Sequence, residues 1–297
     1  MGSAKISGMD MPTDVQTADA PPTRGKRPLH GEPVIDRTLS LLSCFSDDRR
    51  ELTLGELSAR SGIPLSSTLR LAQGLLKWGA LERLPGGEFV VGVRLWEVAS
   101  LAPRGHGVRE IALPFLEDLY EVSRHHVLLA VLDGQEAILI ERLSSRRAPA
   151  VAYRLGGRLP LRSTAVGRVL LAAQPTRLRE VTLALPLDQD FQVENLGSID
   201  ALRLELNEVA RLGYSVVRRT LPSHTVSLAA PIFGANRTIA AAVSILAPDG
   251  SFSPEAALPA LRATARSISI NHSGWPRPEI TKPVEIGKTP LSHLPTS

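Results

Sequence analysis

The strongest constraint on the fold is a pair of short helical patterns separated by a three-residue turn. Thr53 is followed by Glu56 at the spacing of a capping box, which predicts that a helix begins there. Gly62 is placed to end that helix, Pro64 suits the first turn of the next, and Gly79 is placed to close it. Two helices joined by so short a turn predict a helix-turn-helix unit, whose second helix enters the DNA major groove.

The second of these helices carries polar and basic side chains, and no acidic one, along its outer face. Steps of three and four residues bring side chains over one another on a helix, so these side chains share one face. Arginine can bond a guanine edge bidentately, glutamine can read adenine, and serine hydroxyls can bond bases or phosphates. The predicted DNA-contacting residues, including one from the hairpin that follows, are Ser66, Ser67, Arg70, Gln73, Lys77 and Arg83. The opposite stripe, expected to be buried, comprises Thr68, Leu71, Ala72, Leu75 and Leu76.

A solvated face is the other interpretation of such a stripe, and a winged domain used only for protein contacts is a third. The absence of acids, the tight turn and the strand–turn–strand pattern around Pro85-Gly86-Gly87 favour DNA. Gly74 costs about 1 kcal/mol of helix propensity relative to alanine. A close approach to another element would explain its presence.

The chain divides into two folded blocks between ends that lack periodicity. Residues 1–32 and 274–297 are predicted to be disordered. A winged helix-turn-helix domain is predicted for 33–92, and a connecting helix for 93–106. The remaining block, 107–273, interleaves helical stretches with β-hairpins, which predicts an α+β chain with a C-terminal α/β domain on a mainly antiparallel sheet.

Within the second block, the clearest hairpin signal is Asp133-Gly134 between two β-rich runs. Helices are expected at about 164–174 and 198–213, and three further β-runs follow them. His125 and His126 are adjacent, and neighbours on a strand point to opposite faces, so the pair cannot chelate a metal well. We expect them to be surface or helix-end histidines.

Charge and composition limit the class of protein. The 297 residues carry a net charge of +4, which permits a polyanionic partner without demanding one. Cys44 is the single cysteine, which excludes an internal disulfide framework, and its apolar surroundings predict burial. No apolar run is long enough to span a membrane and no secretion signal is visible, so we expect a cytoplasmic protein without a membrane partner. No cofactor or metal-ligand spacing is found, and none is predicted.

These motifs resemble the IclR family of bacterial transcriptional regulators over nearly everything from Pro33 to His272. LTLGELSARSGIPLSSTLRLAQGLLKWGALERLPGGEFVVGVRL is similar to the family's winged helix-turn-helix. GGRLPLRSTAVGRVLLA and RLGYSVVRRTLPSHTVSLAAPIF are similar to two stretches of its effector domain. The resemblance implies a GAF-like effector-binding domain, a homodimer or homotetramer on palindromic double-stranded DNA, and control by a small carboxylate.

The resemblance also implies an effector pocket around a loop, a helix start and two strands. Its residues, with two arginines as possible counter-charges, are Arg162, Thr164, Ala165, Val166, Gly167, Arg219, Ser227 and Ser244. The chain departs from the family at several positions. Leu65 stands for a usual lysine, Arg162 for a histidine, Val217 for an aspartate, and Leu246 for a pocket serine. Because the pocket becomes less polar and more basic, we expect a larger, apolar acid such as an aromatic carboxylate, with Arg162 or Arg219 as its counter-charge.

The alternative is an enzyme of small acids, or a ligand-binding protein, that carries a degenerate DNA-binding module. An enzyme would need a titratable constellation in the second block. No Gly-x-Ser-x-Gly elbow and no convincing Ser-His-Asp order is present in the sequence. We therefore expect a regulator without enzymatic activity.

Overall fold

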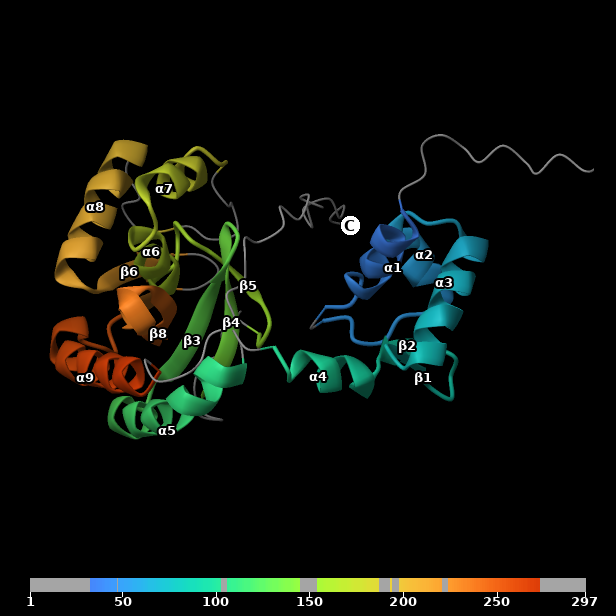
Figure 1. Ribbon diagram of the computed structural model, residues 1–297, viewed down its shortest axis with the longest axis horizontal. Helices are drawn as coiled ribbons and strands as arrows, with labels where there is room; N and C mark the ends of the chain where they lie inside the picture. Colours follow the sequence, from blue (N-terminus) through green and yellow to red (C-terminus); the bar gives the residue numbers. More distant parts are fainter. Residues whose placement is uncertain are drawn as a thin grey trace, which may run out of the picture.

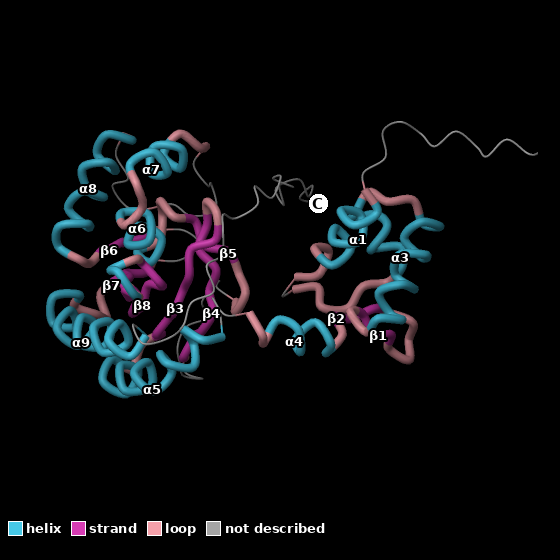
Figure 2. The backbone as a smooth tube through the Cα atoms, in the orientation of Figure 1, coloured by secondary structure: helices cyan, strands magenta, loops and turns pink. Residues whose placement is uncertain are grey.

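Two bodies, joined by the short helix α4 (Val93–Ala99), make up the protein (Figure 1). The computed structural model describes residues 33–46, 48–102, 106–144, 154–186, 193, 198–220 and 224–272. Figure 2 shows that the first body is mostly helical and that the second is a sheet flanked by helices. The predicted fold class is confirmed. The ends predicted to be disordered, 1–32 and 274–297, lie outside the described residues, as does 103–105 of the predicted connecting helix.

The first body is a winged helix-turn-helix domain. Its elements are α1 (Val34–Leu42), α2 (Leu54–Ser61), α3 (Leu65–Trp78) and the antiparallel pair β1 (Leu81–Arg83) and β2 (Phe89–Val91). The capping box at Thr53 and Glu56 is present in both directions, as predicted. Gly62 and Gly79 close α2 and α3 with φ of 68° and 87°, a left-handed conformation that favours glycine. Pro64 was placed one residue too far into α3, because it is the N-cap.

The core of this body lies where the three helices meet the wing. Leu41, Leu57 and Ala72 are fully buried there. Cys44 joins them, as predicted, and burial raises the pKa of its thiol. The buried Thr68 hydroxyl donates to the carbonyl oxygens of the turn before α3, at 3.0 and 3.2 Å. The turn and the recognition helix therefore hold each other in place.

The second body is a six-stranded antiparallel sheet with helices on both faces. Its strands are β3 (His126–Asp133), β4 (Glu136–Leu143), β5 (Arg158–Pro160), β6 (Ser215–Arg219), β7 (Thr225–Phe233) and β8 (Ile239–Pro248), in the order β5-β4-β3-β8-β7-β6. Its helices are α5 (His106–Ser123), α6 (Ala165–Ala172), α7 (Thr176–Leu183), α8 (Ile199–Leu212), α9 (Pro254–His272) and the short η1 (Ala235–Arg237). Helices α5 and α9 cover one face, and α6 and α8 cover the other (Figure 1).

Successive side chains of β3 point to opposite faces of the sheet and belong to two different hydrophobic cores. Leu128 and Ala130 pack toward α6 and α8, while Val127 and Leu129 pack toward α5 and α9. Both faces of the strand are buried, so it appears in the sequence as a continuous apolar run. Within the described residues, no helix is both long and apolar enough to cross a bilayer.

Three local expectations need correction. Helix α7 was not predicted, and β5, a strand of three residues in the stretch AVAYRLGGRLPL, is shorter than the strand and loop that this stretch suggests. His126 is not a surface residue: it begins β3 with only 4% of its surface exposed. The cause is the sheet, because β8 and β4 pair with both edges of β3 and the helices close over its face.

Candidate nucleic-acid interface and ligand pocket

The outer face of α3 is open to solvent. Its exposed polar side chains are Ser66, Arg70, Gln73 and Lys77. Ser67 is half-buried at the flank of this face. The stripe predicted to be buried is buried at Thr68, Leu71, Ala72 and Leu75, and partly so at Leu76. Because the face is continuous and carries no carboxylate, it presents hydrogen-bond donors and positive charge, and no negative charge, to a polyanion.

Two further arginines lie on the elements that follow α3. Arg83 is exposed on the wing, where its Nε donates to the Gly87 carbonyl oxygen at 3.1 Å and its guanidinium lies 5.6 Å from the Phe89 ring centre. Arg94, which the sequence reasoning missed, donates to the carbonyl oxygen of Trp78 at 3.1 Å and stacks on its ring. That bond holds a cation at the C-terminal end of α3, where the helix dipole favours one.

The expected contact for Gly74 is absent. Among the described residues, a Cβ at this position would meet no atom within 4 Å, and the residue is exposed. The prediction that another element of the chain approaches it was therefore wrong. Leu65, the residue that departs from the lysine implied by the resemblance, is 53% exposed. Leu69 is 40% exposed. The space around Gly74 and these apolar side chains belongs to the outer surface of the domain.

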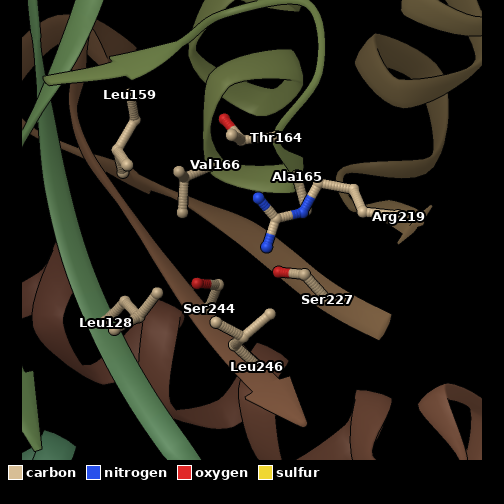
Figure 3. Close-up of a pocket in the computed structure, with 9 residues that line it drawn as sticks. All are labelled: Leu128, Leu159, Thr164, Ala165, Val166, Arg219, Ser227, Ser244 and Leu246. Atoms are coloured by element: carbon tan, nitrogen blue, oxygen red, sulfur yellow. The ribbon is translucent and has the colours of Figure 1, made fainter. Parts of the chain in front are cut away.

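A second candidate site is a pocket between the sheet and the start of α6 (Figure 3). It encloses about 250 Å³ of empty space, part of which is open to solvent. Its lining residues are Leu128, Leu159, Thr164, Ala165, Val166, Arg219, Ser227, Ser244 and Leu246. Six of the eight predicted effector residues are therefore brought together, while Arg162 and Gly167 lie outside the lining. Leu128 and Leu159 were not predicted, because only the register of the sheet places them here.

Arg219 is the cation of this pocket. It is 4% exposed, and Figure 3 shows its guanidinium reaching in from β6 between the start of α6 and the two serines. Its Nη2 donates to Thr225 Oγ1 at 3.1 Å. Burial lowers the pKa of Arg219 to about 10, which still leaves the guanidinium charged at neutral pH. The protein thus holds a desolvated positive charge in an otherwise mostly apolar pocket.

The start of α6 adds backbone donors to the same space. Thr164 is its N-cap: the hydroxyl accepts from Gly167 N at 3.1 Å and donates to the Pro160 carbonyl oxygen at 2.7 Å. The first amides of a helix have no acceptor within the helix, and its dipole favours a negative charge there. A carboxylate could lie between these amides and Arg219 and bind to both.

Gly167 acts by letting the helix approach the strand. A Cβ on this residue would lie 2.5 Å from Leu161 Cα and 2.5 Å from the Pro160 carbonyl oxygen. Both atoms are backbone, so neither can move aside without shifting β5 or α6. The residue determines the shape of the pocket although it does not line it.

Arg162 has a structural role. Its guanidinium donates to the carbonyl oxygens of Leu183 and Leu185, at 3.3 and 2.6 Å, and to that of Pro186. Its own carbonyl oxygen accepts from Arg168 Nε at 2.7 Å, and Arg168 forms an ion pair with Glu205 of α8. These bonds tie the loop before α6 to α7 and α8. Of the two predicted counter-charges, only Arg219 faces the pocket.

The pocket also combines a buried hydroxyl with apolar walls. Ser244 is fully buried, and its Oγ has no hydrogen-bond partner among the described residues. Buried hydroxyls are normally satisfied, so a ligand or a water is the expected partner. Leucines and Val166 supply apolar walls around these polar groups. Over the same described ranges, no group of three or more side chains is arranged to hold a metal ion.

Two family models match the chain, one over each body. Residues 34–85 match the family model described as "IclR helix-turn-helix domain", and residues 102–270 match "Bacterial transcriptional regulator IclR C-terminal". The HTH-type transcriptional regulator KipR of Bacillus subtilis is 29% identical over 80% of this chain and 95% of its own length. The HTH-type transcriptional repressor AllR of Escherichia coli is 27% identical over 83% of this chain and 95% of its own. These relatives are named as regulators of transcription, not as enzymes.

A solved structure is similar over most of the chain. It is an IclR homolog from Microbacterium hydrocarbonoxydans, crystallised as a complex with 4-hydroxybenzoate. Its TM-score is 0.76 at 30% identity, over 80% of this chain and 98% of that one. A transcriptional regulator from Rhodococcus sp. RHA1 follows with a TM-score of 0.70 at 27% identity, over 81% of this chain and 98% of the other.

Proposed function

The chain belongs to the IclR family of HTH-type transcriptional regulators, and we propose that an aromatic carboxylate bound beside Arg219 sets its affinity for an operator. The observation that carries the proposal is the buried, charged guanidinium of Arg219. It lies near the N-terminal end of α6, in a small pocket whose walls are partly leucine. A ligand changes DNA affinity only by the difference between its affinities for the two states of the protein.

For DNA, we propose contacts through Ser66, Ser67, Arg70, Gln73, Lys77 and Arg83. The exposed, acid-free face of α3 supports them. Acidic and basic side chains nearly balance over 33–92, so one domain alone should bind weakly. A homodimer or homotetramer would present two recognition helices about 34–36 Å apart, or a multiple of that, to a palindromic site.

Arg70→Ala should weaken binding to the operator by about 5- to 150-fold, the effect of about 1–3 kcal/mol per lost base contact. The measurement is a gel shift over a series of salt concentrations, on an operator fragment located by footprinting. Binding to unrelated DNA should change much less, because that binding depends on phosphate charge. Arg177→Ala is the matched control, since Arg177 is exposed on α7 in the other body. Equal losses on both DNAs would count against base readout by Arg70.

The ligand class follows from the walls of the pocket. A carboxylate can meet Arg219 and the free amides of α6, while a ring can fill the space beside Leu128, Leu159 and Leu246. The related 4-hydroxybenzoate complex supports an acid of this kind. Short aliphatic acids such as glyoxylate would leave the apolar walls uncovered.

Calorimetry on the full chain tests this assignment. Benzoate and 4-hydroxybenzoate should each bind at least about tenfold more tightly than glyoxylate or acetate, because a ring buries several apolar carbons at about 25 cal/mol per Å². Binding should change the operator affinity in the gel-shift assay. A preference for glyoxylate-sized acids would overturn the assignment of an aromatic ligand.

A further inference from the structure

Two large apolar side chains at the start of α3 have no role in the sites described above. Leu65 is 53% exposed and Leu69 is 40% exposed. Among the described residues, neither is part of the core of the winged domain, whereas Leu76 of the same helix packs against that core. Scattered exposed leucines are common on protein surfaces, so the position of this pair decides whether it has a function.

Helical spacing places Leu69 within the candidate DNA-binding face. It follows Ser66 by three residues and precedes Gln73 by four, so the three side chains lie on one side of α3. Leu65 comes one turn earlier and continues the apolar surface beside Leu69. Both leucines belong to the N-terminal half of α3, and the N-terminal residues of a recognition helix meet base edges in the major groove. The pair is therefore placed to contact bases.

The major groove contains one apolar group that such a side chain can recognise. Thymine carries a C5-methyl group there, whereas cytosine presents its amino group on the corresponding edge. Contact between Leu69 and the methyl group removes both from water, which is favourable. The amino group of a cytosine in the same place would lose its water without gaining a hydrogen bond, so a leucine discriminates between the two pyrimidines.

We propose that Leu69, flanked by Leu65, reads a thymine methyl group in each half of the operator. This inference rests on the proposed function, because it takes α3 to be the helix that enters the major groove. It adds an apolar contact to the hydrogen bonds proposed for Arg70 and Gln73. The contact involves no charge, so its contribution does not depend on salt, unlike that of a phosphate contact.

Replacement of single thymines by deoxyuridine tests the contact, because it removes the methyl group and keeps the hydrogen-bonding groups of the base. The measurement is a gel shift with the full chain on an operator fragment located by footprinting. Replacement of one particular thymine in each half-site should weaken binding by about fourfold, the effect of one methyl group returned to water. The factor should be the same at low and at high salt.

Two variants connect this effect to the leucine. In Leu69→Ala, the same replacement should change the affinity by about onefold, because the methyl group has lost its partner. Alanine has the highest helix propensity and Leu69 is partly exposed, so α3 should remain folded. Leu204→Ala is the matched control, since Leu204 is an exposed leucine on α8 in the other body. It should keep the fourfold effect.

The outcomes separate this inference from the proposed function. If the full chain protects no DNA segment in the footprint, both fail. If it binds an operator but no thymine replacement weakens binding, only the methyl contact is overturned. The same holds if Leu69→Ala keeps the whole deoxyuridine effect, because another side chain then contacts the methyl group. A deoxyuridine effect that shrinks as salt rises would assign the loss to displaced phosphate contacts and would also overturn the inference.

Discussion

Gly167→Ala should lower the free energy of unfolding of the C-terminal body by several kcal/mol and abolish effector binding. The added Cβ would lie 2.5 Å from two backbone atoms, Leu161 Cα and the Pro160 carbonyl oxygen, and 2.6 Å from Thr164 Oγ1. Overpacking of a buried contact typically costs about 1–3 kcal/mol, and more when backbone must move. Relief of the clash moves α6 away from β5. The N-cap bond of Thr164 and the amides that face the pocket would move with it.

The measurement pairs thermal unfolding with calorimetry on the same acids. Gly74→Ala is the matched control, because the same added Cβ meets nothing within 4 Å on the exposed side of α3. It should raise stability by up to about 1 kcal/mol through helix propensity alone. A Gly167→Ala protein that unfolds at the wild-type temperature and binds acids normally would show that α6 does not depend on this close contact.

The helix-turn-helix was predictable because its signals are local. A capping box specifies its own position: Thr53 and Glu56 satisfy each other's backbone amides whatever the rest of the chain does. Gly62 and Gly79 each adopt a backbone conformation that other residues resist, so they end their helices in any context. The buried stripe of α3 follows from helical periodicity in the same way.

The pocket was only partly predictable, because strand register and long-range contacts decide which side chains meet. Arg162 and Arg219 were equal candidates in the sequence. The Arg162 guanidinium instead donates to carbonyl oxygens between Leu183 and Pro186, more than twenty residues later in the chain. These oxygens lie at and just after the end of α7, a helix that was not predicted from the sequence. No local pattern could reveal that contact. His126 was misjudged for the same reason, since its burial depends on strands and helices that are distant in the sequence.

Arg219→Met should weaken binding of the aromatic acid by about 30-fold to several thousand-fold, equivalent to about 2–5 kcal/mol for the loss of a buried charge partner. The same change should leave the unfolding temperature unchanged or raise it. A desolvated guanidinium is costly to bury, as its lowered pKa indicates, and methionine fills much of the same volume without a charge. One opposing cost is the loss of the bond to Thr225, about 0.5–1.5 kcal/mol. Lost affinity without lost stability is the signature of a group retained for a ligand.

Arg218→Met is the control that separates charge from position. Arg218 is the preceding residue, lies on the other face of β6, is 43% exposed and forms an ion pair with Asp249. Exposed pairs contribute about 0–1 kcal/mol, so this variant should be nearly as stable as the wild type and bind the acid normally. If both variants lost the same affinity for the acid, Arg219 would act only through its long-range charge and not through direct contact with the ligand. A large loss of stability with normal acid binding in Arg219→Met would make it a structural residue, and the carboxylate would then need another partner.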